Sequence, residues 1–120
     1  MSKPPIAWLD DVAKHDYAAA YNYLSLKFDE SRAGEVVDRM KKSKLTSRRA
    51  NDILRATGLT ALPLTDPGVK RDLLTLLSGG KLSPVLVCDQ KMGADIADGY
   101  HRVSLAYNID PFMSVPLRLG

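Results

Sequence analysis

The chain has 120 residues, of which 45% are hydrophobic and 26% charged, and it contains a single cysteine. This composition is that of one globular domain, and it excludes wholesale disorder, a collagen-like repeat and a disulfide scaffold. No apolar run reaches the roughly 18 residues of a membrane span, and the first residues lack the apolar core of a secretory signal. The expected compartment is therefore the cytoplasm, with no membrane partner.

The net charge of +3 is unevenly distributed. Residues 39–55 carry seven basic side chains and one acidic side chain, whereas residues 1–38 have a net charge of −3 and residues 56–120 a net charge of 0. A basic window of this kind suits a polyanion such as DNA, although a solvated pair of helices has the same composition. The side chains considered for nucleic-acid contact are Lys41, Lys42, Lys44, Arg48 and Arg49.

The front half of the chain, residues 1–58, has the pattern of three helices. Asp16 is expected to cap the first, whose apolar positions recur at helical spacing from Tyr17 to Phe28. The second runs from about Ser31 to Ser43. The third is expected to open at Thr46 and to end at Gly58.

The back half, residues 59–120, changes from helical to strand periodicity. Asp66 followed by Pro67 indicates a helix start, and this helix is expected to end at Gly79-Gly80. The apolar run Val85–Cys88 suits a strand covered on both faces, so the cysteine is expected to be buried and slow to react. The expected elements that follow are a paired strand at 94–98, a helix at 100–108 and a closing strand at 114–119 with Pro116 near its edge.

The predicted fold class is α+β, with N-terminal helices packed on a small mixed sheet in one domain. The junction of the 94–98 strand and the last helix contains His101 and Arg102, although the dipole of a first helical turn favours acidic residues. A phosphate held by backbone N–H groups and an exposed guanidinium would account for them, and Gly99 would let it approach the backbone. The alternative is that Arg102 forms an ion pair with Asp98 or Asp95.

Three sequence segments of the back half occur in an order that is typical of a known superfamily. They are Leu-Leu-Ser-Gly-Gly-Lys-Leu-Ser-Pro-Val-Leu-Val, then Ile-Ala-Asp-Gly-Tyr-His-Arg, and finally Ser-Val-Pro-Leu-Arg-Leu. From about Leu73 to Leu119, the chain thereby resembles the ParB N-terminal/sulfiredoxin superfamily, whose members run helix, strand, strand, Gly-x-(His/Arg)-Arg turn, helix and strand. The whole chain also resembles a group of short bacterial proteins, a likeness that implies no chemistry.

What the superfamily resemblance implies is a nucleotide site, since sulfiredoxins bind ATP, ParB proteins bind CTP, and related kinases phosphorylate free serine at a similar turn. Carried onto this chain, Gly99 is the glycine of close approach, His101 and Arg102 contact phosphate, and Tyr100 fills the variable position. Asp98 is a candidate base or magnesium ligand beside them. The leading hypothesis is a nucleotide- or phosphate-binding protein, for which ATP or CTP with magnesium are the candidate ligands. Phosphotransfer is its candidate activity, with Asp98 and His101 as catalytic candidates.

Other chemistries have weaker support. Tyr100 stands where sulfiredoxin has its reactive cysteine, which disfavours sulfinic-acid repair. With His15 and His101 as the only histidines, the chain has no zinc-ligand spacing, and no resident metal is expected. Two further hypotheses remain: a non-catalytic interaction protein, and a DNA-binding module in which helices 31–43 and 46–57 form a helix-turn-helix with Arg48 and Arg49 at the start of its second helix.

Overall fold

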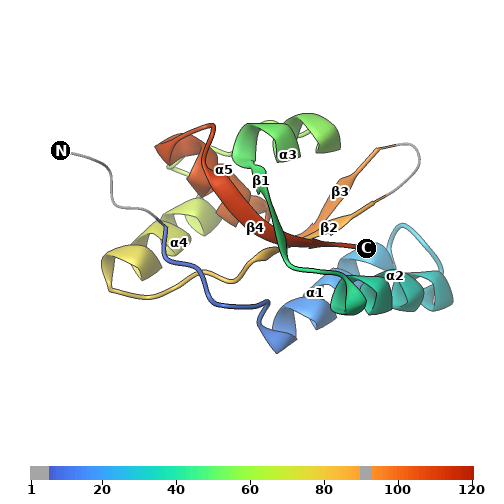
Figure 1. The fold of residues 1–120 in the computed structure, drawn as a ribbon. Helices are drawn as coiled ribbons and strands as arrows, with labels where there is room; N and C mark the ends of the chain where they lie inside the picture. The colour runs from blue at the N-terminus through green and yellow to red at the C-terminus, as the bar shows by residue number, and fades with distance from the viewer. Residues whose placement is uncertain (1–5, 90–92) are drawn as a thin grey trace.

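A four-stranded mixed sheet lies at the centre of the fold, which the computed structural model describes for residues 6–89 and 93–120 (Figure 1). The strand order is β1-β4-β2-β3. β4 pairs antiparallel with β1 and parallel with β2, and β2 and β3 form an antiparallel hairpin. The strands are β1 Thr46–Arg49, β2 Val85–Cys88, β3 Asp95–Asp98 and β4 Ser114–Leu119.

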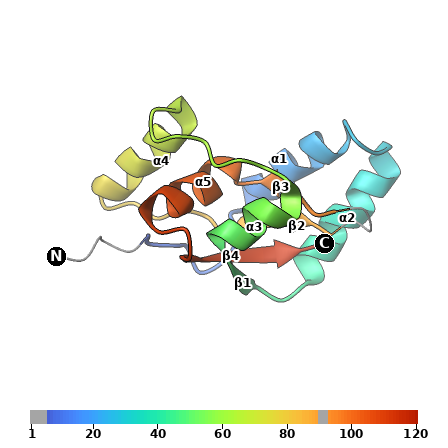
Figure 2. The same cartoon turned by 90° about the horizontal axis from the view of Figure 1, so that it is seen from above.

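Helices cover both faces of this sheet, so the α+β class predicted from the sequence is confirmed. α1 and α2 lie against one face, and α3 and α5 against the other, with α4 packed beside α5 (Figures 1 and 2). None of the described helices is long and apolar enough to cross a membrane. The helices are α1 Lys14–Leu24, α2 Glu30–Lys42, α3 Ala50–Thr57, α4 Pro67–Leu77 and α5 Tyr100–Ile109.

β2 shows why the sheet needs two layers of helices. All four of its residues are buried, and because successive side chains of a strand point to opposite faces, Val85 and Val87 join one core while Leu86 and Cys88 join the other. The predicted strand covered on both faces, its pairing with β3 and the burial of Cys88 are therefore confirmed. The slow reaction of this thiol stays a prediction.

The expected helix start at Thr46 is wrong, because residues 46–49 form the edge strand β1. Their backbone groups pair with β4, and the amide of Ala50, the first residue of α3, donates to the carbonyl of Met113. Pairing with a distant strand overrides the local helical pattern here. A strand thus separates α2 from α3, so the two helices do not form the helix-turn-helix considered above, and the front half is not purely helical.

Two further expectations concern β4 and α1. The closing strand is confirmed at Ser114–Leu119, and its parallel pairing with β2 begins at Leu117, one residue beyond Pro116, which lacks a backbone donor. Asp16 does not cap α1: the N-cap position is Ala13, which makes no side-chain cap, and Asp16 lies inside the first turn with its side chain buried.

Candidate functional site

The start of α5 has the geometry that the sequence predicts for the strand-to-helix turn. β3 ends at Asp98, and Gly99 occupies the N-cap position with φ 110° and ψ 18°, in the left-handed region that favours glycine. No side chain caps this ten-residue helix. Its first N–H groups and the positive end of its dipole are therefore available to an acceptor from outside the helix.

The Arg102 guanidinium is occupied by two carboxylates. Nη2 lies 2.7 Å from Asp98 Oδ2, and Nη1 lies 3.1 Å from Asp16 Oδ2. The Arg102 side chain is only 13% exposed and that of Asp16 only 5% exposed. The structure thus shows the ion pair with Asp98 that the sequence offered as the alternative, and it corrects the expectation of an exposed arginine.

The glycine at this turn makes room for the arginine. A Cβ atom built on Gly99 would lie 2.8 Å from Arg102 Nη2 and 2.9 Å from Val85 Cγ2. The sequence assigned this space to an approaching phosphate, whereas in the structure the guanidinium and a core valine fill it. Arg102 is held against the turn and joins α1, β3 and α5 through its two carboxylate partners.

The other two residues of the turn face different neighbours. The His101 ring is about half exposed and lies over α4, where its Nε2 is 3.5 Å from Asp66 Oδ2 and a Cβ atom on Gly68 would lie 2.5 Å from it. The Tyr100 hydroxyl donates a hydrogen bond to the Thr60 carbonyl. His101 therefore lies beside the start of α5, whereas Tyr100 is hydrogen-bonded to the loop before α4.

A small polar cavity of about 130 Å³ opens at this turn. It is lined by Asp98, Gly99, His101 and Arg102, and by Asp72 from α4, which the sequence analysis did not single out. Among the described residues, none donates a hydrogen bond to the Asp72 carboxylate. The spacing on α4 was a usable signal, because Asp72 follows the buried Val69 by three residues and so lies on the packed side of the helix.

Burial raises the pKa of both carboxyl groups in this cavity. The Asp72 pKa is raised by burial, against the opposing influence of Arg102 and His101. The Asp98 pKa is raised mainly by burial, which outweighs the attraction of Arg102, and the neighbouring Asp16 carboxylate raises it further. Carboxyl groups shifted in this way and gathered in a cleft are a feature of functional sites, although structural ion pairs also produce them.

The balance of charge decides what the cavity can accept. One guanidinium faces three carboxyl groups, those of Asp16, Asp72 and Asp98, so a bare anion would be repelled unless a proton or a cation accompanied it. Mg²⁺ is commonly held by one or two carboxylates together with substrate phosphates, and the cavity-lining Asp72 and Asp98 fit that donor set. Within residues 6–89 and 93–120, no group of three or more His, Cys, Asp or Glu side chains could hold a metal by itself.

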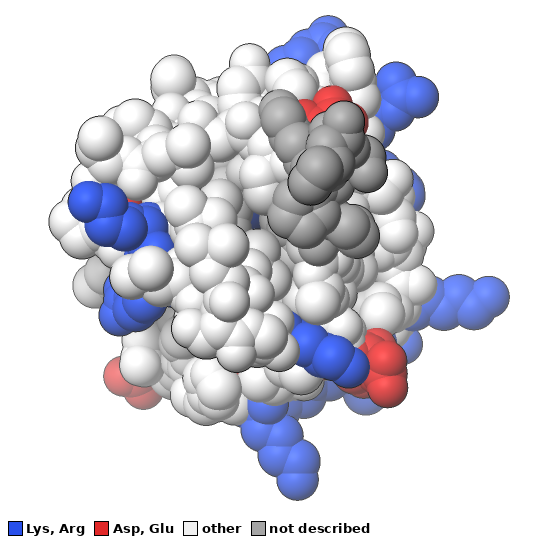
Figure 3. All heavy atoms as spheres, turned by 90° about the vertical axis from the view of Figure 1, so that its left-hand side faces the viewer, with Lys and Arg blue, Asp and Glu red and all other residues white. Residues whose placement is uncertain are grey.

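The side chains considered for nucleic-acid contact are dispersed and partly engaged. Arg48 donates to the Ser47 carbonyl at 2.8 Å, Arg49 lies over the Phe112 ring and Lys41 over the Tyr17 ring. Lys42 ends α2, and Lys44 lies in the connection to β1. On the face that Figure 3 shows, most Lys and Arg side chains lie near the rim. The geometry therefore gives the DNA-binding hypothesis no recognition helix.

The comparisons with known proteins found no matching family model, no matching curated protein and no matching solved structure. Three elements bring together Asp72 from α4, Asp98 from β3 and the first turn of α5 with His101 and Arg102.

Proposed function

We propose that this protein binds a phosphate-bearing ligand, a nucleotide accompanied by Mg²⁺, at the start of α5. The observation that carries the proposal is the polar cavity of about 130 Å³, where two features meet. Within residues 6–89 and 93–120, no side chain caps α5 and no group donates a hydrogen bond to the Asp72 carboxylate. Helix N-termini bind phosphate through free N–H groups and the helix dipole, and phosphates bring hard cations that carboxylates accept.

Each lining residue has a distinct role in this proposal. The first amides of α5 and the imidazole of His101, when protonated, donate to the phosphate oxygens. Asp72 and Asp98 face the magnesium ion that accompanies the phosphate. Arg102 holds Asp98 and the turn in place, because both of its terminal nitrogens are already bonded to carboxylates.

The size of the cavity limits how much of the ligand it can hold. Pockets that enclose a whole small molecule usually have volumes of about 300 Å³ or more. At about 130 Å³, this cavity suits a single phosphoryl group, with the nucleoside extending over the surface. We therefore expect weak discrimination among ATP, CTP and GTP, and competition by inorganic pyrophosphate.

The resemblance of residues 73–119 to the ParB N-terminal/sulfiredoxin superfamily points in the same direction, since those proteins bind nucleotide phosphates at the corresponding turn. The order helix, strand, strand, helix and strand from α4 to β4 agrees with the order that the resemblance implies. The proposal does not depend on this likeness, because the cavity, the start of α5 and the Asp72 carboxylate belong to this chain.

Calorimetric titration with ATP, CTP and GTP, in magnesium and in a metal chelator, tests the proposal. We expect saturable binding that requires magnesium, and about tenfold weaker binding by the Asp72→Asn variant, which removes one charge at constant side-chain size. Asp52→Asn, an exposed aspartate on α3, is the matched control and should bind like the wild type. If no nucleotide binds at millimolar concentration, the proposal is wrong and the interaction-protein hypothesis replaces it.

A further inference from the structure

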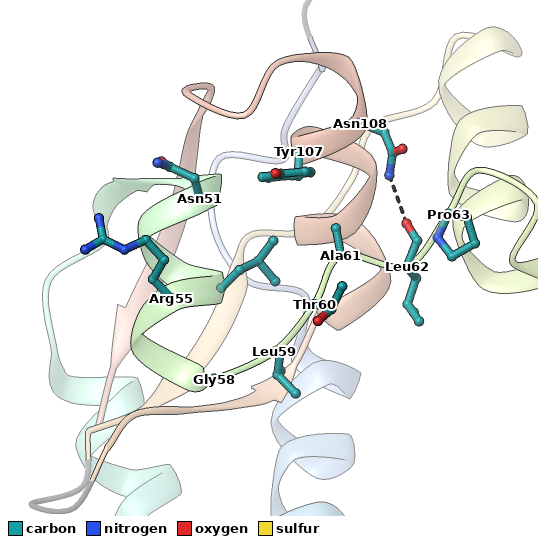
Figure 4. Close-up of a pocket in the computed structure, with 11 residues that line it drawn as sticks. Asn51, Arg55, Gly58, Leu59, Thr60, Ala61, Leu62, Pro63, Tyr107 and Asn108 are labelled. Atoms are coloured by element: carbon teal, nitrogen blue, oxygen red, sulfur yellow. Dashed lines mark hydrogen bonds between the residues drawn. The ribbon is translucent and has the colours of Figure 1, made fainter.

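A second and larger cavity lies between α3, the loop of residues 58–63 and the end of α5 (Figure 4). Its volume is about 650 Å³, within the range of small-molecule sites. It shares no lining residue with the cavity at the start of α5. The nucleotide proposal gives this second cavity no role.

Side-chain hydrogen bonds from α5 hold the loop of residues 58–63, which forms one wall of this cavity. The hydroxyl of the fully buried Ser104 accepts from the Leu62 amide at 3.0 Å, and Asn108 Nδ2 donates to the Leu62 carbonyl at 2.9 Å. The Tyr100 hydroxyl holds the Thr60 carbonyl in the same loop. Polar side chains of α5 thus fasten the loop along this helix and leave a preformed space between the loop and α3.

The lining combines an apolar body with few polar groups. The Tyr107 ring, 37% exposed, lies between α3 and the loop in Figure 4. The single charged residue among those lining the cavity is Arg55. Asn51 also lines the cavity, although its side chain points away from the loop in Figure 4. The apolar lining residues are Leu54, Leu59, Ala61, Leu62 and Pro63.

Arg55 is able to turn toward a ligand at little cost. In Figure 4 its side chain points away from the loop, and its Nη1 lies 3.5 Å from Asp52 Oδ1. The Arg55 side chain is 80% exposed and that of Asp52 is 52% exposed. A solvated ion pair of this kind contributes little to stability, so a competing anion can replace the aspartate.

We propose that this cavity is a binding site for an aromatic carboxylic acid. Its ring packs on Tyr107 and the leucine side chains, and its carboxylate pairs with Arg55. An acid is favoured over a neutral or basic molecule because the lining has one cation and no anion. This site shares no lining residue with the nucleotide site.

The probes that test this proposal are indole-3-propionate and its neutral analogue indole-3-propionamide, titrated into ¹⁵N-labelled protein. We expect saturable chemical-shift changes at the amides of Leu59, Thr60 and Leu62, with tighter binding of the acid than of the amide. The Arg55→Gln variant should bind the acid about fivefold more weakly and the amide unchanged. Arg32→Gln, an exposed arginine on α2 with the same change in charge, should have no effect.

A second variant keeps the test independent of charge. Ala61→Phe places a ring in the cavity and should abolish binding of both probes, while the Arg55→Gln result stands even if Ala61→Phe fails to fold. The proposal is overturned if neither probe shifts the loop amides at its solubility limit, or if the acid and the amide bind equally. Shifts that centre instead on Gly99 and His101 would likewise overturn it, since the acid would then occupy the other cavity.

Discussion

The first turns of α4 and α5 differ in whether a side chain accepts hydrogen bonds from their free N–H groups. Both helices have N–H groups without helical partners at their start. At α4, the Asp66 carboxylate accepts from the amides of Gly68 and Val69 at 3.0 and 3.1 Å, and Pro67 removes a donor. At α5, Gly99 contributes no cap, and the side chains that follow are a histidine and an arginine.

The start of α4 is therefore capped by the chain's own side chain, whereas the start of α5 is open to an outside acceptor. The open start is surrounded by polar side chains from three other elements: Asp16 on α1, Asp72 on α4 and Asp98 on β3. The start of α4 is linked to the start of α5 through His101, whose ring lies beside Asp66. Substitutions at the two helix starts should therefore differ in how much they lower the free energy of unfolding and in how they affect ligand binding.

The largest expected effect is that of Arg102→Ala, which leaves the buried Asp16 and the partly buried Asp98 without their cation. Removing one partner of a buried ion pair costs about 3–5 kcal/mol, and we expect about 3 kcal/mol here because Asp98 is partly exposed. Urea unfolding measures this loss. Arg102→Lys, which keeps the charge but not the two-pronged geometry, should lose less. A loss below about 1 kcal/mol for Arg102→Ala would show that the ion pairs do not form in solution.

Gly99→Ala should cost about 2 kcal/mol, since it adds backbone strain at positive φ to a steric clash with the guanidinium and Val85. The matched control is Gly58→Ala: Gly58 also has positive φ, but a Cβ atom there would meet no atom within 4 Å. Its expected cost is about 1 kcal/mol from strain alone. Equal losses in thermal unfolding for the two variants would contradict the close packing of Arg102 on the turn.

At the closed start, Asp66→Ala should destabilise the protein by about 1 kcal/mol, the typical contribution of an N-cap side chain. Asp66→Asn keeps an acceptor and should retain most of that stability. Neither change should abolish nucleotide binding, because Asp66 does not line the cavity. If Asp66→Ala removes nucleotide binding while the protein stays folded, then Asp66 belongs to the ligand site and does not act only as a cap of α4.

The smallest effect concerns pH. Burial raises the Asp72 pKa above its ordinary value of 3.8, so ionisation of this carboxyl group disfavours the folded state. Asp72→Asn should therefore stabilise the protein by less than about 1 kcal/mol at neutral pH. This gain should disappear as the pH falls through the folded-state pKa of Asp72 toward 3.8. Denaturant unfolding at several pH values measures it, and a variant less stable than the wild type at pH 7 would contradict the proposed sign.

Much of the back half follows from local signals in the sequence. Asp66-Pro67 marks the start of α4, the apolar run at Val85–Cys88 marks a buried strand, and Gly99 marks the junction between β3 and α5. Each of these signals lies within a few residues of the element that it specifies. For that reason they predict α4, the β2–β3 hairpin and α5 without knowledge of the tertiary fold.

The features that sequence analysis missed depend on distant partners. Thr46–Arg49 has no apolar alternation and becomes a strand because β4 lies beside it. Asp16 has the residue type and position of a cap, but its partner Arg102 is 86 residues away along the chain. Asp72 reaches the cavity only because α4 packs on α5. The position of the turn and the pairing of Arg102 with Asp98 were therefore predictable, whereas the contributions of Asp16 and Asp72 were not.

The place of β4 in the sheet has a consequence for the order of folding. β1 and β2 are not neighbours in the sheet, and both pair with β4, which follows them in the chain. During synthesis, the helices and the β2–β3 hairpin can form early, because their contacts are local. The full sheet can close only after residues 114–119 have left the ribosome. Such non-local closure slows folding, and until then β1 and the open side of β2 expose unpaired backbone groups to other chains.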